Sequence, residues 1–510
     1  MKKKHIKLFA VIFLIVAVLT SCATTTSSGY QLPKKNVTVS LGISTATMRN
    51  GEQRTFTPTF KNTDTPPQLI WTSSDESILK VDQNGTVTAY NTTSGSLTAN
   101  ITASIADNPN MRSICTITVL SSTQAHFITA GPGQDASTQA VISWHSPDPT
   151  STLQYTDANK SDFTNSLTLD GEPTISEWAD LSYIYRYRVE LDDLQPGSTY
   201  NYRIMLSDGT YSETSTFRTA GTDGTFSFAW LSDVHAATAE SMGNITTILN
   251  YEREKTDISF CLFTGDMVNQ GKRYSYWESW NDSGLLSDMT YAFVIGNHEY
   301  YPNKTAEFAT PSFYLDYVAI PKNNGDSAPA DYWFLYNNVL FICLDTMAGE
   351  FASSENPNPA LEKQAKWFED VIAENEGRYT FIIVAQHYAF LDGDVEGTGF
   401  YSFWYPYFDK YCVDLALSSD THIYSRSQTL YNNKVSEKGT VYMTSPISEG
   451  KALDEIINRP EALGERSAFN AVEKKLMGGS YVEVTPNSLT VHVIGKDGNE
   501  YDSVTIPARR

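Results

Sequence analysis

Cysteine is scarce in this chain, which has five cysteines in 510 residues and no pair at CxxC spacing. This scarcity argues against a disulfide framework and against a metal site built from thiolates. Cys261, Cys343 and Cys412 each lie inside an apolar run, so we expect them to be small buried side chains. A metal site in this chain would therefore use oxygen and imidazole donors.

Basic residues are also few, since 37 Lys and Arg stand against 59 Asp and Glu, a formal net charge of −22. Such a surface repels nucleic acid and anionic lipid headgroups, so we expect no nucleic-acid binding. An anionic phosphate substrate would need local positive charge from metal ions. A hydrophobic content of 41% and a length of 510 residues allow about three packed domains.

Long apolar runs are missing except near the N-terminus, where residues 8–19 follow four lysines. This run is too short to span a bilayer comfortably and is typical of the apolar region of a signal peptide. It ends in Leu19-Thr20-Ser21-Cys22, which resembles the lipobox of bacterial lipoproteins. An ordinary signal peptide with an incidental cysteine is the alternative.

The lipobox resemblance implies a lipoprotein signal peptide over residues 1–21 and lipidation of Cys22. Residues 22–36 are rich in Thr, Ser and Gly, which predicts a flexible tether. We therefore expect an extracytoplasmic protein that is anchored in a bacterial membrane, either in the periplasm or at the cell surface.

Residues 37–120 alternate short β-rich runs with Gly, Asn and Asp, a pattern typical of a small β-sandwich. The stretch Ile70–Asp75, followed by Leu79–Ala89, resembles the bacterial Ig-like family, group 2. Asn84-Gly85 would supply its hairpin turn, since both residues tolerate positive φ. Modules of that family are spacers or adhesion surfaces, and we expect a spacer.

Residues 124–220 form a second β-rich unit, which contains the pattern Leu194-Gln195-Pro196-Gly197-Ser198-Thr199-Tyr200. This pattern resembles fibronectin type III sandwiches, and most of all the N-terminal domain that precedes the catalytic domain in purple acid phosphatases. We expect Tyr200 to pack under the Pro196-Gly197 turn, and we expect no chemistry from this unit.

From residue 225 to residue 507, strands alternate with helical stretches, which predicts an α/β domain with parallel or mixed sheets. One helix is indicated by Leu361, Ala365, Phe368 and Ile372, which share a face. Residues 479–506 alternate again and predict closing antiparallel strands. The expected fold class is thus two all-β sandwiches followed by an α/β domain.

Five apolar runs in this last region each end at residues of metal-ligand type. These residues are Asp233 and His235; Asp266; Asn297, His298 and Glu299; His387; and Asp420 and His422. Such runs predict strands of one sheet covered on both faces. Because ligand sites lie at the carboxyl ends of such strands, we expect these side chains to converge on one crevice.

Histidine is rare, with eight in the chain, yet four of the five after residue 220 lie at these strand ends. A single histidine there would more often be structural, and His492, inside an alternating strand, is expected to be so. Four together favour phosphate-ester chemistry, in which two metal ions about 3.5–4 Å apart activate water and clamp phosphoryl oxygens. Imidazole, carboxylate and amide donors suit Fe, Mn or Zn.

The five motifs resemble, in order and spacing, those of calcineurin-like metallophosphoesterases: D-x-H, GD-x(4)-G, GNH(D/E), a lone H and GHxH. The resemblance runs from Phe226 to Arg426 and implies a four-layer domain over residues 225–507 with mixed sheets and two metal ions. The implied ligands are Asp233, His235 and His422 for the first metal, Asn297 and His387 for the second, and Asp266 as the bridge.

The resemblance also implies catalytic roles for two further residues. His298 would act on the leaving-group oxygen or stabilise the transferring phosphoryl group. Glu299 could orient His298 by accepting its other N–H, or it could be a simple surface carboxylate.

Two features depart from the families that the chain resembles. Purple acid phosphatases have a metal-binding Tyr after the bridging Asp, where this chain has Met267-Val268-Asn269, so we predict no tyrosinate-to-iron charge-transfer band. In addition, Ser419 and Asp420 replace the Gly and the first His of GHxH. Asp420 could ligate the second metal and favour Mn, Fe or Mg over Zn, or it could leave a weakened site.

The sequence therefore supports two hypotheses. The first is a lipid-anchored metallophosphoesterase that hydrolyses phosphomonoesters or phosphodiesters of small molecules or of phosphorylated macromolecules. The alternative is a surface binding or adhesion lipoprotein whose phosphoesterase domain is catalytically weak or inactive. The sequence does not choose between monoesters and diesters.

Overall fold

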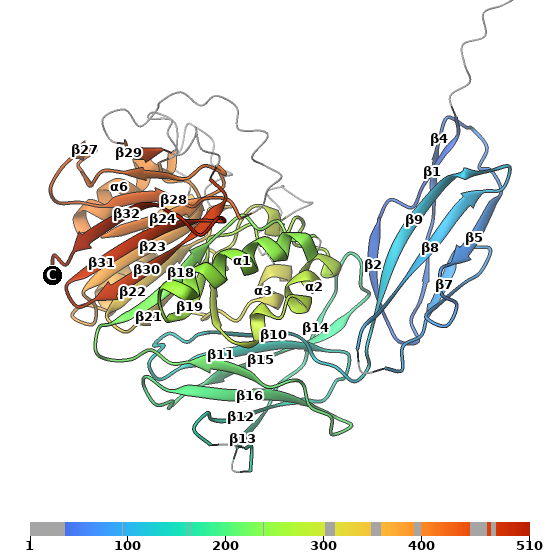
Figure 1. The fold of residues 1–510 in the computed structure, drawn as a ribbon, viewed down its shortest axis with the longest axis horizontal. Coiled ribbons are helices and arrows are strands. Elements are labelled where there is room, and N and C mark those ends of the chain that lie inside the picture. The colour runs from blue at the N-terminus through green and yellow to red at the C-terminus, as the bar shows by residue number, and fades with distance from the viewer. Residues whose placement is uncertain are drawn as a thin grey trace, which may run out of the picture.

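The computed structural model describes residues 36–93, 95–160, 162–164, 166–237, 239–300, 312–347, 359–391, 399–448, 467–470 and 476–510. The expected signal peptide, the expected lipidation site Cys22 and nearly all of the tether lie outside these ranges. Within them, no helix has both the length and the apolar character needed to cross a membrane. The chain forms two β-sandwiches followed by a larger domain of sheets and helices, as predicted (Figure 1).

The first sandwich packs the sheet β2-β9-β8-β5 against the sheet β3-β7-β6, with β1 paired to β4 at one end. Met48, Trp71 and Ile117 lie in its core. Gly85 has a φ of +82° in the turn between β6 and β7, whereas Asn84 does not need positive φ. Its assignment to the Ig-like family stays a prediction. The strands are β1 (Thr38–Ser40), β2 (Thr45–Arg49), β3 (Gln53–Thr55), β4 (Thr59–Lys61), β5 (Leu69–Ser73), β6 (Leu79–Val81), β7 (Thr86–Ala89), β8 (Leu97–Ile105) and β9 (Asn108–Leu120).

The second sandwich packs the sheet β10-β11-β15-β14 against the sheet β13-β12-β16-β17. Tyr200 is buried, and its hydroxyl accepts the backbone N–H of Gln195 at 2.9 Å, which confirms its predicted place under the Pro196-Gly197 turn. The strands are β10 (His126–Pro132), β11 (Ala140–Ser146), β12 (Ser151–Asp157), β13 (Leu167–Asp170), β14 (Thr174–Ser176), β15 (Ile184–Leu191), β16 (Thr199–Leu206) and β17 (Ser215–Arg218).

The third domain contains two mixed sheets packed face to face. The six-stranded sheet has the order β20-β19-β18-β30-β31-β32, in which β18, β19 and β20 are parallel and β30, β31 and β32 are antiparallel. Its strands are β18 (Phe226–Leu231), β19 (Ile258–Phe263), β20 (Thr290–Phe293), β30 (Gly478–Thr485), β31 (Ser488–Gly495) and β32 (Glu500–Pro507). The predicted antiparallel closing strands are thereby confirmed.

The seven-stranded sheet has the order β21-β22-β23-β24-β28-β25-β29. Its strands are β21 (Tyr332–Tyr336), β22 (Val339–Leu344), β23 (Phe381–Tyr388), β24 (Leu415–Ser419), β25 (Ser425–Ser427), β28 (Val441–Thr444) and β29 (Ser467–Asn470). A short hairpin of β26 (Leu430–Tyr431) and β27 (Lys434–Val435) extends beyond it. The five strands that carry the predicted ligands therefore belong to two sheets, not to one as expected from their apolar runs.

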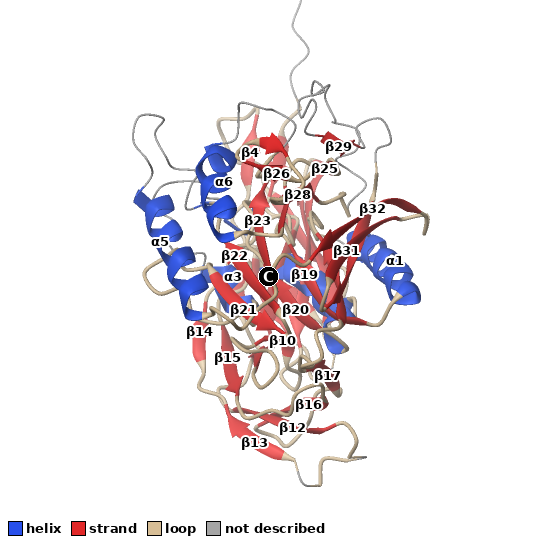
Figure 2. Cartoon of the chain, turned by 90° about the vertical axis from the view of Figure 1, so that its left-hand side faces the viewer, coloured by secondary structure: helices blue, strands red, loops and turns tan. Residues whose placement is uncertain are grey.

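Helices cover the outer faces of both sheets, which gives the four layers that were predicted. Helices α1 (Ala239–Lys255) and α2 (Tyr274–Asp282) pack on the six-stranded sheet, and α5 (Pro359–Glu374) and α6 (Gly399–Tyr411) pack on the seven-stranded sheet. Figure 2 shows α1 on one side of the sheets and α5 and α6 on the other. Shorter helical segments are η1 (Leu285–Ser287), η2 (His298–Tyr300) and α3 (Ser312–Tyr317). The predicted apolar face of α5 is buried at Leu361, Ala365, Phe368 and Ile372.

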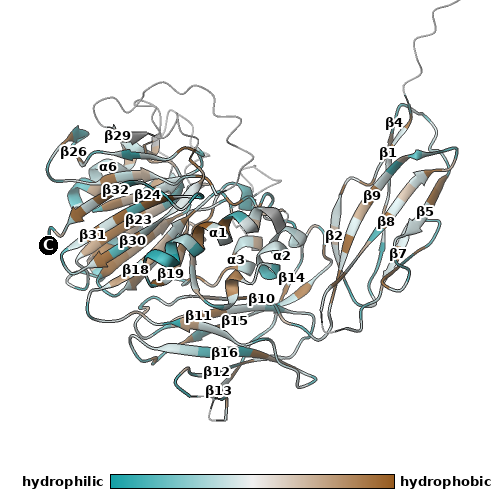
Figure 3. Ribbon diagram, viewed as in Figure 1, coloured by the Kyte–Doolittle hydropathy of each residue, from teal (hydrophilic) through white to brown (hydrophobic). Residues whose placement is uncertain are grey.

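Aromatic side chains fill the space between the two sheets. The Phe228 ring meets the Phe341 ring edge-on at 5.3 Å, and Phe260 meets Phe334 at 5.8 Å. Figure 3 shows hydrophobic residues along the strands that form this interior, such as β30 and β31. Of the cysteines, Cys261 and Cys343 are buried as expected, but Cys412 is exposed because it follows the end of α6 and precedes β24.

The second sandwich shares a core with the third domain. Phe127 packs against Tyr274 and Tyr317 at ring distances of 4.5 and 5.0 Å. Gly131 lies so close to Ala319 that a Cβ would stand 1.6 Å from its carbonyl oxygen. The two domains are therefore one packed unit, whereas the first sandwich stands to the side and touches this unit near α2 (Figure 1).

Candidate metal centre

The predicted ligands lie in the loops at the carboxyl ends of β18, β19, β20 and β24, except for His387, which is the second-to-last residue of β23. Five of them have left-handed backbones, a conformation that is uncommon for residues other than glycine. These are Asp233 (φ +52°), His235 (+44°), Asp266 (+52°), Asp420 (+69°) and His422 (+58°). Such strain concentrates at functional sites, where the surrounding structure holds it in place.

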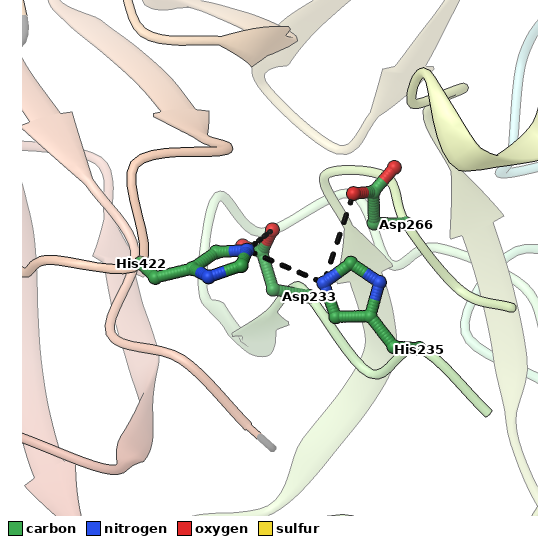
Figure 4. Close-up of side chains that lie close together, drawn as sticks. All are labelled: Asp233, His235, Asp266 and His422. Atoms are coloured by element: carbon green, nitrogen blue, oxygen red, sulfur yellow. Dashed lines mark hydrogen bonds and ion pairs between the residues drawn. The ribbon is translucent and has the colours of Figure 1, made fainter. Parts of the chain in front are cut away.

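A first pocket gathers Asp233, His235, Asp266 and His422, whose donor atoms all lie within 4.8 Å of one another (Figure 4). The Nε2 atoms of His235 and His422 are 3.2 Å apart, and His422 Nε2 is 3.3 Å from Asp233 Oδ1. Asp233 is fully buried, and apart from the His422 imidazole its carboxylate oxygens have no hydrogen-bond partner among the described residues. A buried carboxylate with so little support is costly, so this donor set fits a cation.

A second pocket surrounds Nε2 of His387, which is fully buried. This atom lies 3.0 Å from Asn297 Oδ1, 3.2 Å from Asp266 Oδ1 and 3.7 Å from Asp420 Oδ1. The pocket thus offers three oxygens and one nitrogen. The first pocket, by contrast, offers two imidazoles and two carboxylates.

Asp266 lies between the two pockets. Its Oδ1 faces His387 Nε2 at 3.2 Å, while its Oδ2 faces His235 Nε2 at 3.8 Å. Burial opposes ionisation of Asp266, but the imidazoles of His387, His235 and His298 outweigh it and hold its pKa well below the usual range. The carboxylate is therefore charged and turned toward both pockets, as a bridging ligand requires.

The other ring nitrogen of His387 is held by the backbone. Nδ1 lies 2.7 Å from the carbonyl oxygen of Thr264, to which it donates, and 2.9 Å from Ser419 Oγ. Donation from Nδ1 to the backbone fixes the orientation of the ring and turns Nε2 into the second pocket, where a metal ligand must stand. Gly265 makes room for this ring, because a Cβ at that position would stand 2.4 Å from His387 Nδ1.

Ser419 is a participant that motif comparison missed. Its hydroxyl also lies 2.5 Å from the Thr264 carbonyl oxygen, so it ties β24 to the loop that carries Asp266. The sequence did show a serine where the family motif has glycine. Only the tertiary structure shows that its hydroxyl reaches His387 and Thr264.

Asp420 sits at the outer side of the second pocket, and its side chain is 39% exposed. Partial burial, followed by the charges of Asp266 and Asp233, raises its pKa to about 6 against the opposing effect of His387. The side chain lies within reach of a cation held by His387, although it is the most open of the donors in that pocket.

His298 lies beside both pockets without closing either. Its Nδ1 is 2.9 Å from the carbonyl oxygen of Asn269, and its Nε2 is 3.8 Å from Asp266 Oδ2. Its ring stands 4.5 Å from the ring of His235, and its side chain is 22% exposed. An imidazole in this place can reach a ligand held over the two pockets.

Both predictions for Glu299 are wrong. The carboxylate is buried, not on the surface, and it accepts the backbone N–H groups of Asp266, Met267, Val268 and Gly296. The His298 Nδ1 that it was expected to accept is instead placed against the Asn269 carbonyl. Glu299 points away from His298 because η2 turns consecutive side chains to different sides.

Two family models match the chain. The model for the purple acid phosphatase N-terminal domain matches residues 125–219, and the model for calcineurin-like phosphoesterases matches residues 226–424. Purple acid phosphatase 1 from Ipomoea batatas is 25% identical over 226 residues, which cover 41% of this chain and 44% of that protein. The chain thus matches less than half the length of this curated relative.

Solved structures share the fold. A purple acid phosphatase from yellow lupin (Lupinus luteus) seeds superposes with a TM-score of 0.60 and 16% identity, covering 80% of this chain and 79% of that one. PhoD superposes with a TM-score of 0.52 and 13% identity, covering 76% and 90%. Residues 226–424 thus match the calcineurin-like phosphoesterases, and residues 125–219 before them match the purple acid phosphatase N-terminal domain.

Proposed function

We propose that this protein is a metal-dependent hydrolase of phosphate esters. The observation that carries the proposal is the position of Asp266, whose two oxygens face two separate pockets of imidazole and oxygen donors. A pair of Fe, Mn or Zn ions bound there would polarise the phosphoryl oxygens and lower the pKa of water. Asp233, His235 and His422 would hold one ion, Asn297, His387 and Asp420 the other, with Asp266 shared.

The chain's own residues supply the remaining requirements. His298 has an exposed edge next to the pockets and can donate a proton to the leaving-group oxygen or a hydrogen bond to the phosphoryl group. The Asn269 carbonyl fixes the ring by accepting from Nδ1, so that Nε2 faces the substrate side. A phosphate monoester or diester, free or on a macromolecule, is the substrate class.

Turnover of a model substrate tests this proposal. Residues 23–510, loaded with Mn²⁺ or Fe²⁺, should hydrolyse p-nitrophenyl phosphate or its bis ester, and Asp266→Asn should lower kcat by at least about 1,000-fold, because removing the shared charge uncouples both pockets. A folded, metal-loaded chain without turnover on either ester would instead support the binding or adhesion lipoprotein. The open position of Asp420 is the observation that favours that alternative.

The second pocket should prefer a harder cation than the first. It offers one nitrogen and three oxygens, whereas the first offers two nitrogens and two oxygens. Oxygen donors favour Mn²⁺ or Mg²⁺ over Zn²⁺. Mass spectrometric metal analysis should therefore find two different metals per chain after loading with a mixture, and iron-loaded protein should show no tyrosinate charge-transfer band.

We further propose that the protein is a lipoprotein anchored through Cys22 outside the cytoplasm, with the first sandwich as a spacer between the membrane and the packed unit of the other two domains. The support is sequence alone: four lysines, the apolar residues 8–19 and the lipobox-like Leu19-Thr20-Ser21-Cys22. Labelled palmitate should be incorporated by the wild-type chain in bacteria and not by Cys22→Ala. Equal labelling of both would exclude the anchor without touching the hydrolase proposal.

A further inference from the structure

Glu299 joins the two loops that carry the central ligands. Its Oε2 accepts the backbone N–H of Asp266 at 2.9 Å and of Gly296 at 2.7 Å, and its Oε1 accepts those of Met267 at 2.8 Å and Val268 at 3.2 Å. The side chain is 1% exposed. One carboxylate thus satisfies four backbone donors that no strand or helix would otherwise pair.

The loop after β20 also binds the side chain of Asp266. The backbone N–H of His298 donates to Asp266 Oδ1 at 3.0 Å, so the loop after β20 holds the Asp266 side chain while Glu299 holds its backbone. Gly296 allows this approach, since a Cβ there would stand 2.3 Å from Asp266 Oδ1 and 2.9 Å from Glu299 Oε2. Asp266 has a left-handed φ of +52°, which needs outside support.

We propose that Glu299 is a positioning residue that fixes Asp266 between the two pockets and thereby determines whether two metal ions bind as a pair. The inference rests on the proposed function in one respect, namely that Asp266 is the shared ligand. Glu299 takes no part in proton transfer, because backbone donors occupy both of its oxygens. Without this carboxylate, the Asp266 loop moves and each pocket binds its ion separately.

Glu299→Gln is the informative variant, because either orientation of the amide turns an NH₂ group against two backbone N–H donors. The matched control is Glu252→Gln, which changes a buried glutamate whose oxygens have no hydrogen-bond partner in the described part of the chain. Mn²⁺ is the probe, and the measurements on residues 23–510 are a calorimetric titration and electron paramagnetic resonance at low temperature.

Wild type and Glu252→Gln should bind two Mn²⁺ with an exchange-coupled spectrum, as expected for ions sharing a carboxylate about 3.5–4 Å apart. Glu299→Gln should keep the first equivalent within about threefold, bind the second at least about tenfold more weakly and show uncoupled Mn²⁺ signals, since residues that orient ligands typically change affinity 10–100-fold. Two tightly bound, coupled ions in Glu299→Gln would overturn the proposal.

A measurement on the wild type decides the matter if Glu299→Gln does not fold. In the metal-free chain, peptides covering residues 265–268 and 296 should exchange their amide hydrogens slowly, because Glu299 holds them without metal. Fast exchange there, becoming slow only with Mn²⁺, would overturn the proposal. None of these measurements needs turnover, so a chain that binds a coupled pair yet cleaves no ester refutes the proposed function and leaves this inference standing.

Discussion

At the scale of single residues, the metal centre depends on strained backbones held by precise neighbours. Five of the twelve non-glycine residues with positive φ in the described parts of the chain are predicted ligands. Each costs about 1 kcal/mol or more in isolation. Their strain is offset by bonds such as those of Glu299 to the Asp266 loop, so the ligand loops are positioned before any ion binds.

Ser419 provides the first test at this scale. Ser419→Ala removes the hydroxyl next to His387 Nδ1 but leaves the Thr264 carbonyl as its acceptor. We expect the second pocket to bind Mn²⁺ about threefold to tenfold more weakly in a calorimetric titration, a partial loss of the usual orienting effect. Ser418→Ala is the control, because Ser418 bonds the Met443 carbonyl and should leave metal affinity unchanged.

Asp420 provides the second test at the scale of single residues. Asp420→His replaces a hard oxygen donor with imidazole, so the ratio of Zn²⁺ to Mn²⁺ affinity in the second pocket should rise at least about tenfold. Competition titrations followed by mass spectrometry measure this ratio. Asp420→Asn keeps an oxygen donor and should not raise it. An unchanged ratio in Asp420→His would mean that residue 420 does not contact the ion.

At the scale of secondary-structure elements, helix α1 contains a buried carboxyl group that makes no hydrogen bond to the described residues around it. Glu252 is fully buried beside Gly479 of β30, and burial raises its pKa well above the usual value. Neither carboxylate oxygen bonds to any residue that the structure describes. Burial therefore favours the neutral form of Glu252 in the folded protein, whereas the exposed side chain of the unfolded chain is ionised at pH 7.

Glu252→Gln should stabilise the protein in a pH-dependent way. An acid with a raised folded pKa is protonated in the folded state only, so wild-type stability falls as the pH rises above about 4.5, at roughly 1.4 kcal/mol per pH unit. Urea titrations should show the variant more stable by up to about 3 kcal/mol at pH 7 and by little at pH 4. Equal stability curves would show that Glu252 finds a partner in solution.

At the scale of the whole molecule, the second sandwich completes the catalytic domain. Trp178 packs against Tyr274 at 5.2 Å and against Phe313 at 5.3 Å, and His145 Nε2 meets the Asp316 carbonyl at 2.8 Å. The first sandwich touches the rest mainly through polar contacts, such as Thr47 Oγ1 donating to Glu278 at 2.8 Å. Burial there raises the Glu278 pKa to about 8, so this contact adds little stability at neutral pH.

Two truncations test this difference. Residues 120–510, which lack the first sandwich, should unfold cooperatively with a stability within about 2 kcal/mol of the full chain, since the lost contacts are few and partly unfavourable. Residues 225–510 lack Phe127 and Trp178, which belong to a core shared by both domains. Loss of each large aromatic side chain should lower the free energy of unfolding by several kcal/mol. We expect strong dye binding and no sharp thermal transition for this piece. A cooperative transition would show that the sandwich is dispensable.

Local sequence patterns predicted the strands and most of the site, because each ligand ends an apolar run whose period and length are visible in the chain. Asp233, Asp266 and His387 were found this way, and the structure brings them together. The division into two sheets was not visible, since an apolar run says that a strand is buried but not which strands pair with it. The prediction that Cys412 is buried was wrong for a similar reason, because the turn after α6 interrupts what looked like one apolar run.

The sequence by itself determined the donor types, their order along the chain and the fold that follows from buried strands ending at polar loops. It did so because periodicity and motif spacing are properties of neighbouring residues. Only the tertiary structure decided that Asp266 turns one oxygen to each pocket and that Glu299 holds backbone rather than histidine. Those outcomes depend on how loops from neighbouring strands and from the two sheets pack together, and no local pattern contains the direction in which a side chain points from one loop to the next.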